Sequence, residues 1–322
     1  MRVIVYGVGA IGGAVAAALC DNGQEVIGIA RGRMLWAIKA NGLHMQSPVY
    51  DKVHKFECVS KPAEIEFQSD DMILMCMKTQ DTQAALEDLR AAGVTTQPIF
   101  CLQNGVANER IALRIFPNVH GVTVMLPGNY LDPGEVAAFC EPKFGMFDIG
   151  RYPKGQDADD ARLARAFEGS MIVPFLHDDV MQSKYGKLLM NLQNGLTAAF
   201  GKDAEFEDLY EAAKAEALAA IEAAGITWQD VSGKSDPRRS EIMRMGKIEG
   251  LKTVGGSTAQ SLARGGTVEI DYLSGEISLT GRLHGVPTPV NDAVSALVAA
   301  MARDGRAPGS ADPEGMRRAL KL

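Results

Sequence analysis

The chain opens with Val3-Ile4-Val5-Tyr6-Gly7-Val8-Gly9-Ala10-Ile11-Gly12, an apolar β-branched run that leads directly into three spaced glycines. The run predicts a buried strand, and the small apolar residues from Ala10 to Cys20 predict a helix after it. In this setting Gly7 permits a tight turn, Gly9 lets the backbone approach a pyrophosphate, and Gly12 lets the helix pack on the strand. The stretch therefore predicts dinucleotide binding; the alternative is a Gly-rich turn with a structural role only.

The end of the second predicted strand, Glu25–Ile29, indicates which dinucleotide is bound. A carboxylate at this position binds the ribose diol of NAD, whereas a basic residue accommodates the additional phosphate of NADP. Here the strand continues into Ala30-Arg31-Gly32-Arg33, without a carboxylate. The sequence therefore favours NADP, with Arg31 as the phosphate ligand. The alternative is that Arg31 and Arg33 are solvated residues at the start of the next helix.

Strand and helix patterns alternate over the first half of the chain, which predicts a mostly parallel sheet with helices on both faces. The predicted strands are Val3–Tyr6, Glu25–Ile29, Met72–Met77, Ile99–Leu102 and Val119–Val124, with an edge strand at Met171–Phe175. Arg151–Asp160 is expected to be a surface connection. From Val180 onward, the apolar residues recur at helical spacing. We therefore expect an α/β Rossmann-type N-terminal domain that binds NADP, residues 1–176, followed by an all-α substrate and catalytic domain, residues 177–322.

Composition excludes several other classes of protein. The 322 residues are 46% hydrophobic, and 33 basic against 40 acidic residues give a net charge of −7, which argues against disorder and against general affinity for nucleic acid or anionic membranes. The five cysteines show no zinc spacing and are expected to be reduced, mostly buried thiols, and no metal site is expected. A strand pattern from Met1 onward and apolar runs far shorter than about 20 residues predict a cytoplasmic protein.

Two predicted strands end in loops with unusual polar groups. Lys78-Thr79-Gln80 follows the strand that begins at Met72, and Gln103-Asn104-Gly105 follows the one that begins at Ile99. Ligands of open α/β sheets bind at the carboxyl ends of the strands, so Lys78 and Asn104 are candidates for contact with the cofactor or the substrate. Taken singly, each loop is equally consistent with an ordinary strand-to-helix turn.

The second half contains a polar stripe on an apolar helix. Lys187, Asn191 and Asn194 are spaced i, i+4 and i+7 and so lie on one face. Buried charged and amide groups are costly unless they are paired, so these three either form a structural network or line a polar cavity. Two later features, Ser257 and Glu269-Ile270-Asp271-Tyr272, are by themselves consistent with a helix N-cap and with acidic residues at a helix start.

Together these motifs, in this order over nearly the whole chain, resemble the ketopantoate reductase family, also called 2-dehydropantoate 2-reductases. The resemblance implies an NADPH-binding Rossmann domain, a helical domain that closes over it, and a 2-oxo acid between them, in a reaction of pantothenate biosynthesis. It also implies Lys187 as general acid, Asn191 and Asn194 near the substrate hydroxyl or carbonyl, and Ser257 at its carboxylate. Glu269 and Asn104 would help to hold the cofactor ribose or the substrate, with Glu269 also in the catalytic set, and Lys78 would lie near the nicotinamide.

Two segments match no pattern of that family that we can carry over, residues 128–133 and 228–254. Substrate identity therefore stays open between 2-dehydropantoate and a related 2-oxo acid. The alternatives are an NADP-dependent dehydrogenase of another hydroxy acid and a non-catalytic NADP-binding regulatory protein. The expected partner is a small-molecule substrate, with a homodimer possible.

Overall fold

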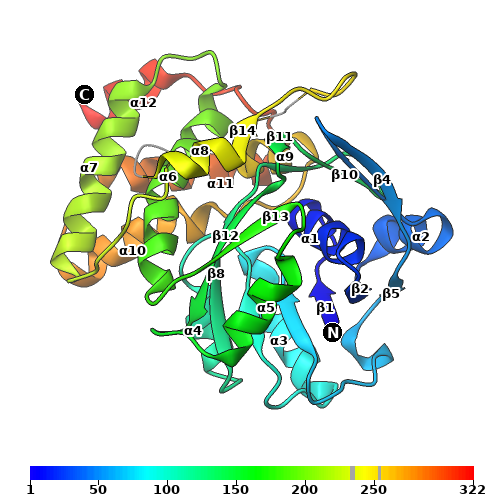
Figure 1. Ribbon diagram of the computed structural model, residues 1–322. Coiled ribbons are helices and arrows are strands. Elements are labelled where there is room, and N and C mark those ends of the chain that lie inside the picture. Colours follow the sequence, from blue (N-terminus) through cyan, green and yellow to red (C-terminus); the bar gives the residue numbers. More distant parts are fainter. Residues whose placement is uncertain (233–235, 253–254) are drawn as a thin grey trace. The chain divides into compact units, whose positions relative to one another are not determined.

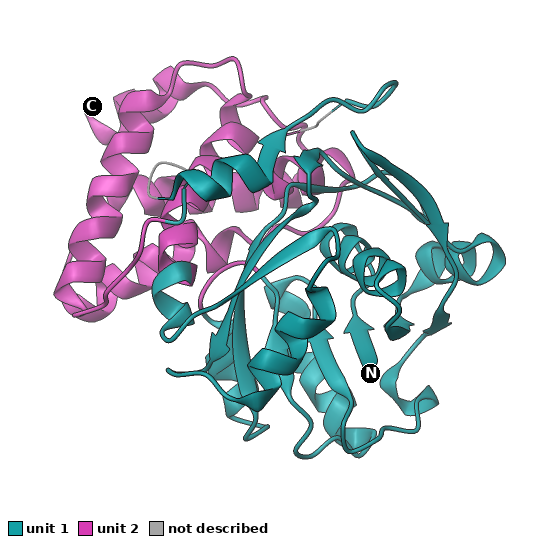
Figure 2. Ribbon diagram, viewed as in Figure 1, with its two compact units in different colours: residues 1–103, 107–183, 231–252 teal, residues 104–106, 184–230, 253–322 magenta. Residues whose placement is uncertain are grey.

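The computed structural model describes residues 1–232, 236–252 and 255–322. The chain forms two compact units, which Figure 2 shows in different colours. Unit 1 contains residues 1–103, 107–183 and 231–252, and unit 2 contains residues 104–106, 184–230 and 253–322. The division therefore differs from a single cut after residue 176, because residues 231–252 return to the first unit.

Unit 1 is built on an eight-stranded sheet with the order β13-β12-β8-β7-β6-β1-β2-β5 (Figure 1). Its strands are β1 (Arg2–Tyr6), β2 (Glu25–Ile29), β5 (Glu57–Val59), β6 (Met72–Met75), β7 (Ile99–Cys101), β8 (Val119–Met125), β12 (Gly145–Arg151) and β13 (Ile172–Leu176). All neighbouring pairs are parallel except β8 and β12. The expected mostly parallel sheet and the edge position of the strand that contains Pro174 are confirmed.

The side chains of β1 alternate between two apolar cores. Val3 and Val5 belong to a core shared with α1 (Ala10–Asp21), α2 (Gly32–Asn41) and α5 (Ala158–Phe167). Ile4 belongs to a core shared with α3 (Thr82–Ala91) and α4 (Asn108–Leu113). Because successive residues of a strand point to opposite faces, an uninterrupted apolar run requires helices on both sides. Short 3₁₀ helices are η1 (Pro62–Glu64) and η2 (Thr79–Asp81) in unit 1 and η3 (Ile270–Tyr272) in unit 2.

Unit 1 also contains strands that the sequence patterns did not predict. A second sheet has the order β4-β3-β10-β9 and consists of β3 (Leu43–Ser47), β4 (Tyr50–His54), β9 (Gly128–Tyr130) and β10 (Glu135–Ala138). Helix α1 packs against this sheet as well as against β1 and β2. A Cβ atom at Gly13 would lie 3.0 Å from Val136 of β10. Contact on both sides explains why α1 is made almost entirely of alanine, glycine and other apolar residues.

Unit 2 is helical, as expected. Its helices are α6 (Val180–Phe200, in this unit from residue 184), α7 (Glu207–Ala223), α9 (Ser257–Ala263), α10 (Ser274–His284), α11 (Pro289–Arg303) and α12 (Pro313–Leu320). Ile270–Tyr272, where the sequence is consistent with a helix start, forms the turn η3, and α10 follows it. Within the described residues, no helix combines the length and the apolar character needed to cross a membrane.

Among the described residues, the half of the chain expected to be all helical also contains a strand. Helix α8 (Pro237–Ile242) is followed by β14 (Met243–Met245), which pairs antiparallel with β11 (Cys140–Pro142). Both elements belong to unit 1. Their short length and mixed polarity leave little periodic signal in the sequence, so only the pairing with a distant strand defines them.

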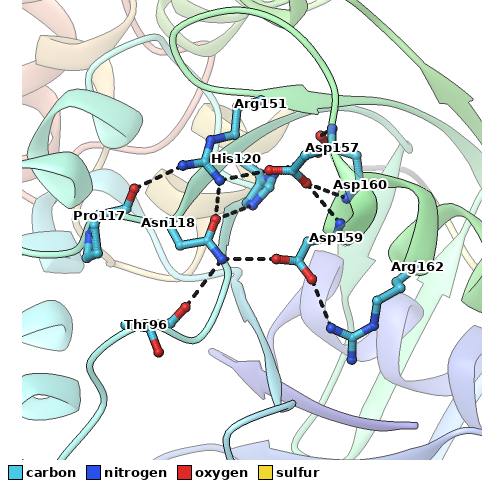
Figure 3. A network of polar contacts seen from close by, with 9 residues as sticks. All are labelled: Thr96, Pro117, Asn118, His120, Arg151, Asp157, Asp159, Asp160 and Arg162. Atoms are coloured by element: carbon cyan, nitrogen blue, oxygen red, sulfur yellow. Dashed lines mark hydrogen bonds and ion pairs between the residues drawn. The ribbon is translucent and has the colours of Figure 1, made fainter.

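The predicted surface connection Arg151–Asp160 is wrong in one respect, since Asp160 is completely buried. Its Oδ1 lies 2.7 Å from Nδ1 of His120, whose Nε2 lies 3.0 Å from Asn118 Oδ1. Figure 3 shows that Arg151 and Asp157 continue this network. Ligand atoms of His120, Asp157 and Asp159 lie within 4.8 Å of one another, but Arg151, Arg162 and Asn118 already bind these carboxylates. We therefore interpret the network as structural.

The five cysteines, all in the described part of the chain, form no disulfide bonds, and Cys58, Cys101 and Cys140 are buried. The others, Cys20 and Cys76, are partly exposed. Burial raises the pKa of Cys20 and of Cys58 to about 11, which keeps both thiols protonated at neutral pH. These cysteines therefore behave as small apolar side chains of unit 1.

Candidate functional site

The glycine loop between β1 and α1 has the geometry of a phosphate cradle. Gly7 has a φ of +100°, and a Cβ there would lie 2.7 Å from the backbone nitrogen of Met77. At Gly12 a Cβ would lie 2.2 Å from the carbonyl oxygen of Gly7, so the helix can approach the turn only without a side chain. Gly9, the N-cap of α1, lies open, since a Cβ there would have no neighbouring atom within 4 Å. Its backbone faces free space at the positive end of the helix dipole, which suits an anion.

Arg31 lies at the N-cap of α2, and its side chain is 77% exposed. Its Nη2 lies 3.3 Å from Oδ2 of Asp81, at the end of η2. A carboxylate therefore does lie near the end of β2, although it comes from a loop 50 residues further along the chain. This pair is exposed on both sides and contributes little to stability, so Arg31 remains available to an anionic ligand.

The loops after β6 and β7 are joined by a buried network of hydrogen bonds. Thr82 Oγ1 donates to Asn108 Oδ1 at 2.8 Å, and Asn108 Nδ2 donates to Thr79 Oγ1 at 3.1 Å. Gln103 Nε2 donates to Thr82 Oγ1 at 3.1 Å, while its Oε1 is buried and has no hydrogen-bond partner among the described residues. Thr79 and Gln103 thus help to shape the strand ends. Lys78, at the N-cap of η2, is partly exposed.

Asn104 and Lys187 meet in unit 2. Nζ of Lys187 donates to Oδ1 of Asn104 at 3.0 Å. Gly105 has a φ of +77°, and a Cβ there would lie 2.7 Å from the carbonyl oxygen of Tyr272 in η3. This close approach packs the loop of Asn104 against the turn that follows Glu269, as only glycine permits. Two motifs 83 residues apart are thereby brought to one place.

The pKa of the Lys187 ammonium is strongly lowered. Desolvation, together with the positive charge of Lys184, lowers its pKa to about 7, and the buried carboxylate of Glu269 opposes the shift. Lys184 is itself buried and lies three residues earlier on α6, so it extends the polar stripe by one turn. The sequence analysis did not identify Lys184, although the spacing of the stripe could have revealed it.

The stripe continues beyond Lys187 as predicted. Asn194 Nδ2 donates to Asn191 Oδ1 at 3.2 Å, which confirms that the two amides share one helix face. Asn191 is buried, and its Nδ2 has no hydrogen-bond partner among the residues that the structure describes. A buried donor of this kind is costly unless a ligand or water satisfies it. The amide of Asn191 is therefore a candidate ligand contact.

Ser257 lies beside the end of this stripe and is exposed. The N-cap of α9 is Gly256 rather than Ser257, and no side chain caps the helix. A Cβ at Gly256 would lie 2.5 Å from Asn194 Oδ1, so the start of α9 packs directly on that amide. The helix-cap interpretation of Ser257 is wrong, because its hydroxyl lies one residue inside the helix and makes no capping bond.

Known proteins support the assignment of a family. The model of the ketopantoate reductase family, PanE/ApbA, matches residues 3–152, and the model of its C-terminal domain matches residues 179–302. A 2-dehydropantoate 2-reductase of Mesorhizobium japonicum is 28% identical over 94% of this chain and 98% of its own. The crystal structure of a PanE/ApbA family ketopantoate reductase from Ralstonia eutropha superposes with a TM-score of 0.79, at 29% identity, over 95% of this chain and 99% of its own. A ternary structure of D-mandelate dehydrogenase with NADH and anilino(oxo)acetate also has a TM-score of 0.79, at 24% identity, over 95% and 99% of the two chains, and so supports the fold.

The Rossmann-type unit, the helical unit and these relatives define a nicotinamide-dependent oxidoreductase that acts on a CH–OH group. Within that class, the chain belongs to the ketopantoate reductase family, since the two family models together cover most of its length.

Proposed function

We propose that this protein reduces a 2-oxo acid, 2-dehydropantoate or a close relative, with NADPH as the hydride donor and Lys187 as the general acid. The observation that carries the proposal is the Lys187 ammonium, whose pKa of about 7 lies where a proton donor works best at neutral pH. The test is NADPH oxidation by the purified protein with a panel of 2-oxo acids that includes 2-dehydropantoate. A non-catalytic regulatory protein would bind NADPH and oxidise it with none of them.

In the proposed reaction, the side chains of this protein act on the ketone oxygen of the substrate. When bound, NADPH would supply the hydride that reduces the ketone carbon. As that carbon becomes tetrahedral, negative charge builds on its oxygen, and Lys187 donates a proton from Nζ to it. Asn104 Oδ1 accepts a hydrogen bond from the same Nζ and so limits the directions in which the ammonium can point. Lys187 lowers the activation free energy because its ammonium attracts the developing alkoxide more strongly than it attracts the ketone.

The neighbouring residues take binding roles in this proposal. Asn191 and Asn194 offer amide groups to the hydroxyl or carbonyl region of the substrate, and the unsatisfied Nδ2 of Asn191 supports this role. Ser257 binds the carboxylate, and its exposed hydroxyl at the first turn of α9 favours an anion there. Glu269 holds the ribose or the substrate and stabilises the protonated form of Lys187.

We propose that the phosphates of the dinucleotide bind to residues of unit 1. The open backbone at Gly9 supports a pyrophosphate at the glycine loop from Gly7 to Gly12. We propose that Lys78 lies near the nicotinamide. We propose NADPH over NADH because Arg31 replaces the carboxylate that would bind the ribose diol. The ion pair with Asp81 moderates this preference, since Asp81 competes with the phosphate for Arg31.

Arg31→Asp should reverse the cofactor preference. The wild-type protein is expected to bind NADPH at least about tenfold more tightly than NADH, roughly 1.4 kcal/mol, because the guanidinium binds the 2′-phosphate. Nicotinamide fluorescence titrations with both dinucleotides measure the ratio. Asp81→Asn is the matched variant: it releases Arg31 and should tighten NADPH binding while NADH binding stays the same. Equal affinities of the wild type for both dinucleotides would contradict the assignment.

The pH profile of the reduction should follow Lys187. A general acid must be protonated in the free enzyme, so kcat/KM is expected to fall about tenfold per pH unit above a pH near 7. Lys184→Met removes the neighbouring positive charge and should move this limb to higher pH. Glu269→Gln removes the opposing negative charge and should move it to lower pH. If the pH at which kcat/KM begins to fall were the same in both variants as in the wild type, a group other than Lys187 would control the profile.

A further inference from the structure

A buried carboxylate, Asp148 of β12, joins two segments of unit 1 that are far apart in the sequence. It is 1% exposed. Its Oδ1 accepts a hydrogen bond from Nη2 of Arg239 at 2.6 Å, and its Oδ2 accepts one from the hydroxyl of Ser183. Arg239 is 6% exposed and Ser183 is fully buried. Both oxygens of the carboxylate are therefore used, each by a different segment.

Arg239 belongs to α8, in the segment 231–252 that returns to unit 1. Its guanidinium lies over the ring of Phe175 at 5.3 Å, and its Nη1 lies 3.7 Å from the sulfur of Met146. A planar guanidinium that is stacked on a ring and bonded to a carboxylate has little freedom to rotate. Arg239 thus links α8 to Asp148 of β12 and Phe175 of β13, in addition to the pairing of β14 with β11.

Ser183 lies in the first turn of α6, the helix that carries Lys187. Lys187 lies four positions after Ser183, so the two side chains lie on the same face, about one turn apart. Unit 1 ends within this helix at Ser183, and unit 2 begins at Lys184. The bond from Ser183 to Asp148 therefore holds α6 at the residue where the helix leaves the first unit.

A buried ion pair is a poor device for stability alone, because apolar residues of similar shape often stabilise a core as well. It is directional, however, and it fixes the side chains that share it. Because a side chain extends outward from the helix axis, a small rotation of the first turn of α6 would displace Lys187 Nζ from its partner, Oδ1 of Asn104. Displacements of about 1 Å in a reacting group can cost about a hundredfold in rate.

We propose that Asp148 is a positioning residue for Lys187: it fixes the rotation of α6 through Ser183, and Arg239 fixes the carboxylate. The proposal rests on the proposed function, in which Lys187 is the general acid. It assigns a role to α8, which supplies Arg239.

The first test compares Ser183→Ala with Asp160→Asn. Both variants weaken a buried carboxylate contact of unit 1, but Asp160 pairs with His120 and makes no side-chain hydrogen bond to α6 among the described contacts. Ser183→Ala should lower kcat about tenfold, with KM and NADPH affinity changed less than about threefold. Ser183→Thr restores the hydroxyl and should recover most of kcat. Asp160→Asn should lower Tm at least as much as Ser183→Ala and retain the kcat of the wild type.

A second measurement does not depend on turnover. Amide hydrogen exchange over residues 184–191 should become at least about tenfold faster in Ser183→Ala and in Asp148→Asn, and stay unchanged in Asp160→Asn. Unchanged exchange in the first two variants would overturn the positioning role, as would a kcat that falls only in proportion to Tm in all three. A wild-type protein that reduces no 2-oxo acid, with exchange behaving as expected, would instead overturn the proposed function.

Discussion

Lys187→Ala should lower kcat/KM for the best 2-oxo acid by about a hundredfold or more, the range typical of losing a general acid. The affinity for NADPH should change little, because the proposed role of Lys187 is to protonate the substrate oxygen. Steady-state rates of NADPH oxidation, with fluorescence titration of the cofactor, measure both quantities.

Lys202→Ala provides the control for that variant. Lys202 is an exposed lysine of unit 2 just after the end of α6, so its loss changes the net charge equally. We expect wild-type turnover from it. If Lys187→Ala also turned over at the wild-type rate, the lysine would have a structural role, and its hydrogen bond to Asn104 would serve only to join the loop to the helix.

Ser257→Ala should raise KM for the 2-oxo acid by about one to two powers of ten and leave the affinity for the cofactor unchanged. The expected loss, roughly 1.5 to 3 kcal/mol, is that of one hydrogen bond to a charged group. Initial rates over a range of 2-oxo acid concentrations measure KM, with NADPH affinity determined separately.

Thermal unfolding of the same variant separates binding from structure. Because Gly256 is the N-cap of α9 and Ser257 is exposed, Tm should stay close to that of the wild type. Ser257→Thr, which keeps the hydroxyl, should retain most of the wild-type KM. A lower Tm with an unchanged KM would mean that the hydroxyl supports the helix and that the carboxylate is bound elsewhere.

Local patterns in the sequence were sufficient to predict the two-part architecture, and they also named most of the residues that we propose for the site. The run from Val3 to Gly12 predicted a strand, a tight turn and a helix because each step depends on neighbouring residues, and the close approaches at Gly7 and Gly12 agree with it. The shared face of Asn191 and Asn194 followed from helical periodicity alone. The same periodicity, extended by one turn, would have included Lys184.

The tertiary structure alone decided what depends on residues far apart in the chain. The pairing of Arg31 with Asp81, the contact of Lys187 with Asn104 and the burial of Asp160 against His120 have no local signature. The lowered pKa of Lys187 likewise requires knowledge of what surrounds its ammonium.

The segment 231–252 is the clearest case of this limit. Its sequence is charged, and it lies within residues 228–254, which match no pattern of the family, so the sequence predicted only that it belongs to the all-α domain. In the structure it rejoins unit 1, where Arg239 reaches Asp148, 91 residues away. An ion pair forms wherever the folded backbone brings opposite charges together in a place shielded from water, and no spacing within the segment encodes that meeting. Periodicity in the sequence determined which faces of the helices and strands are buried, whereas the fold determined which charges meet there.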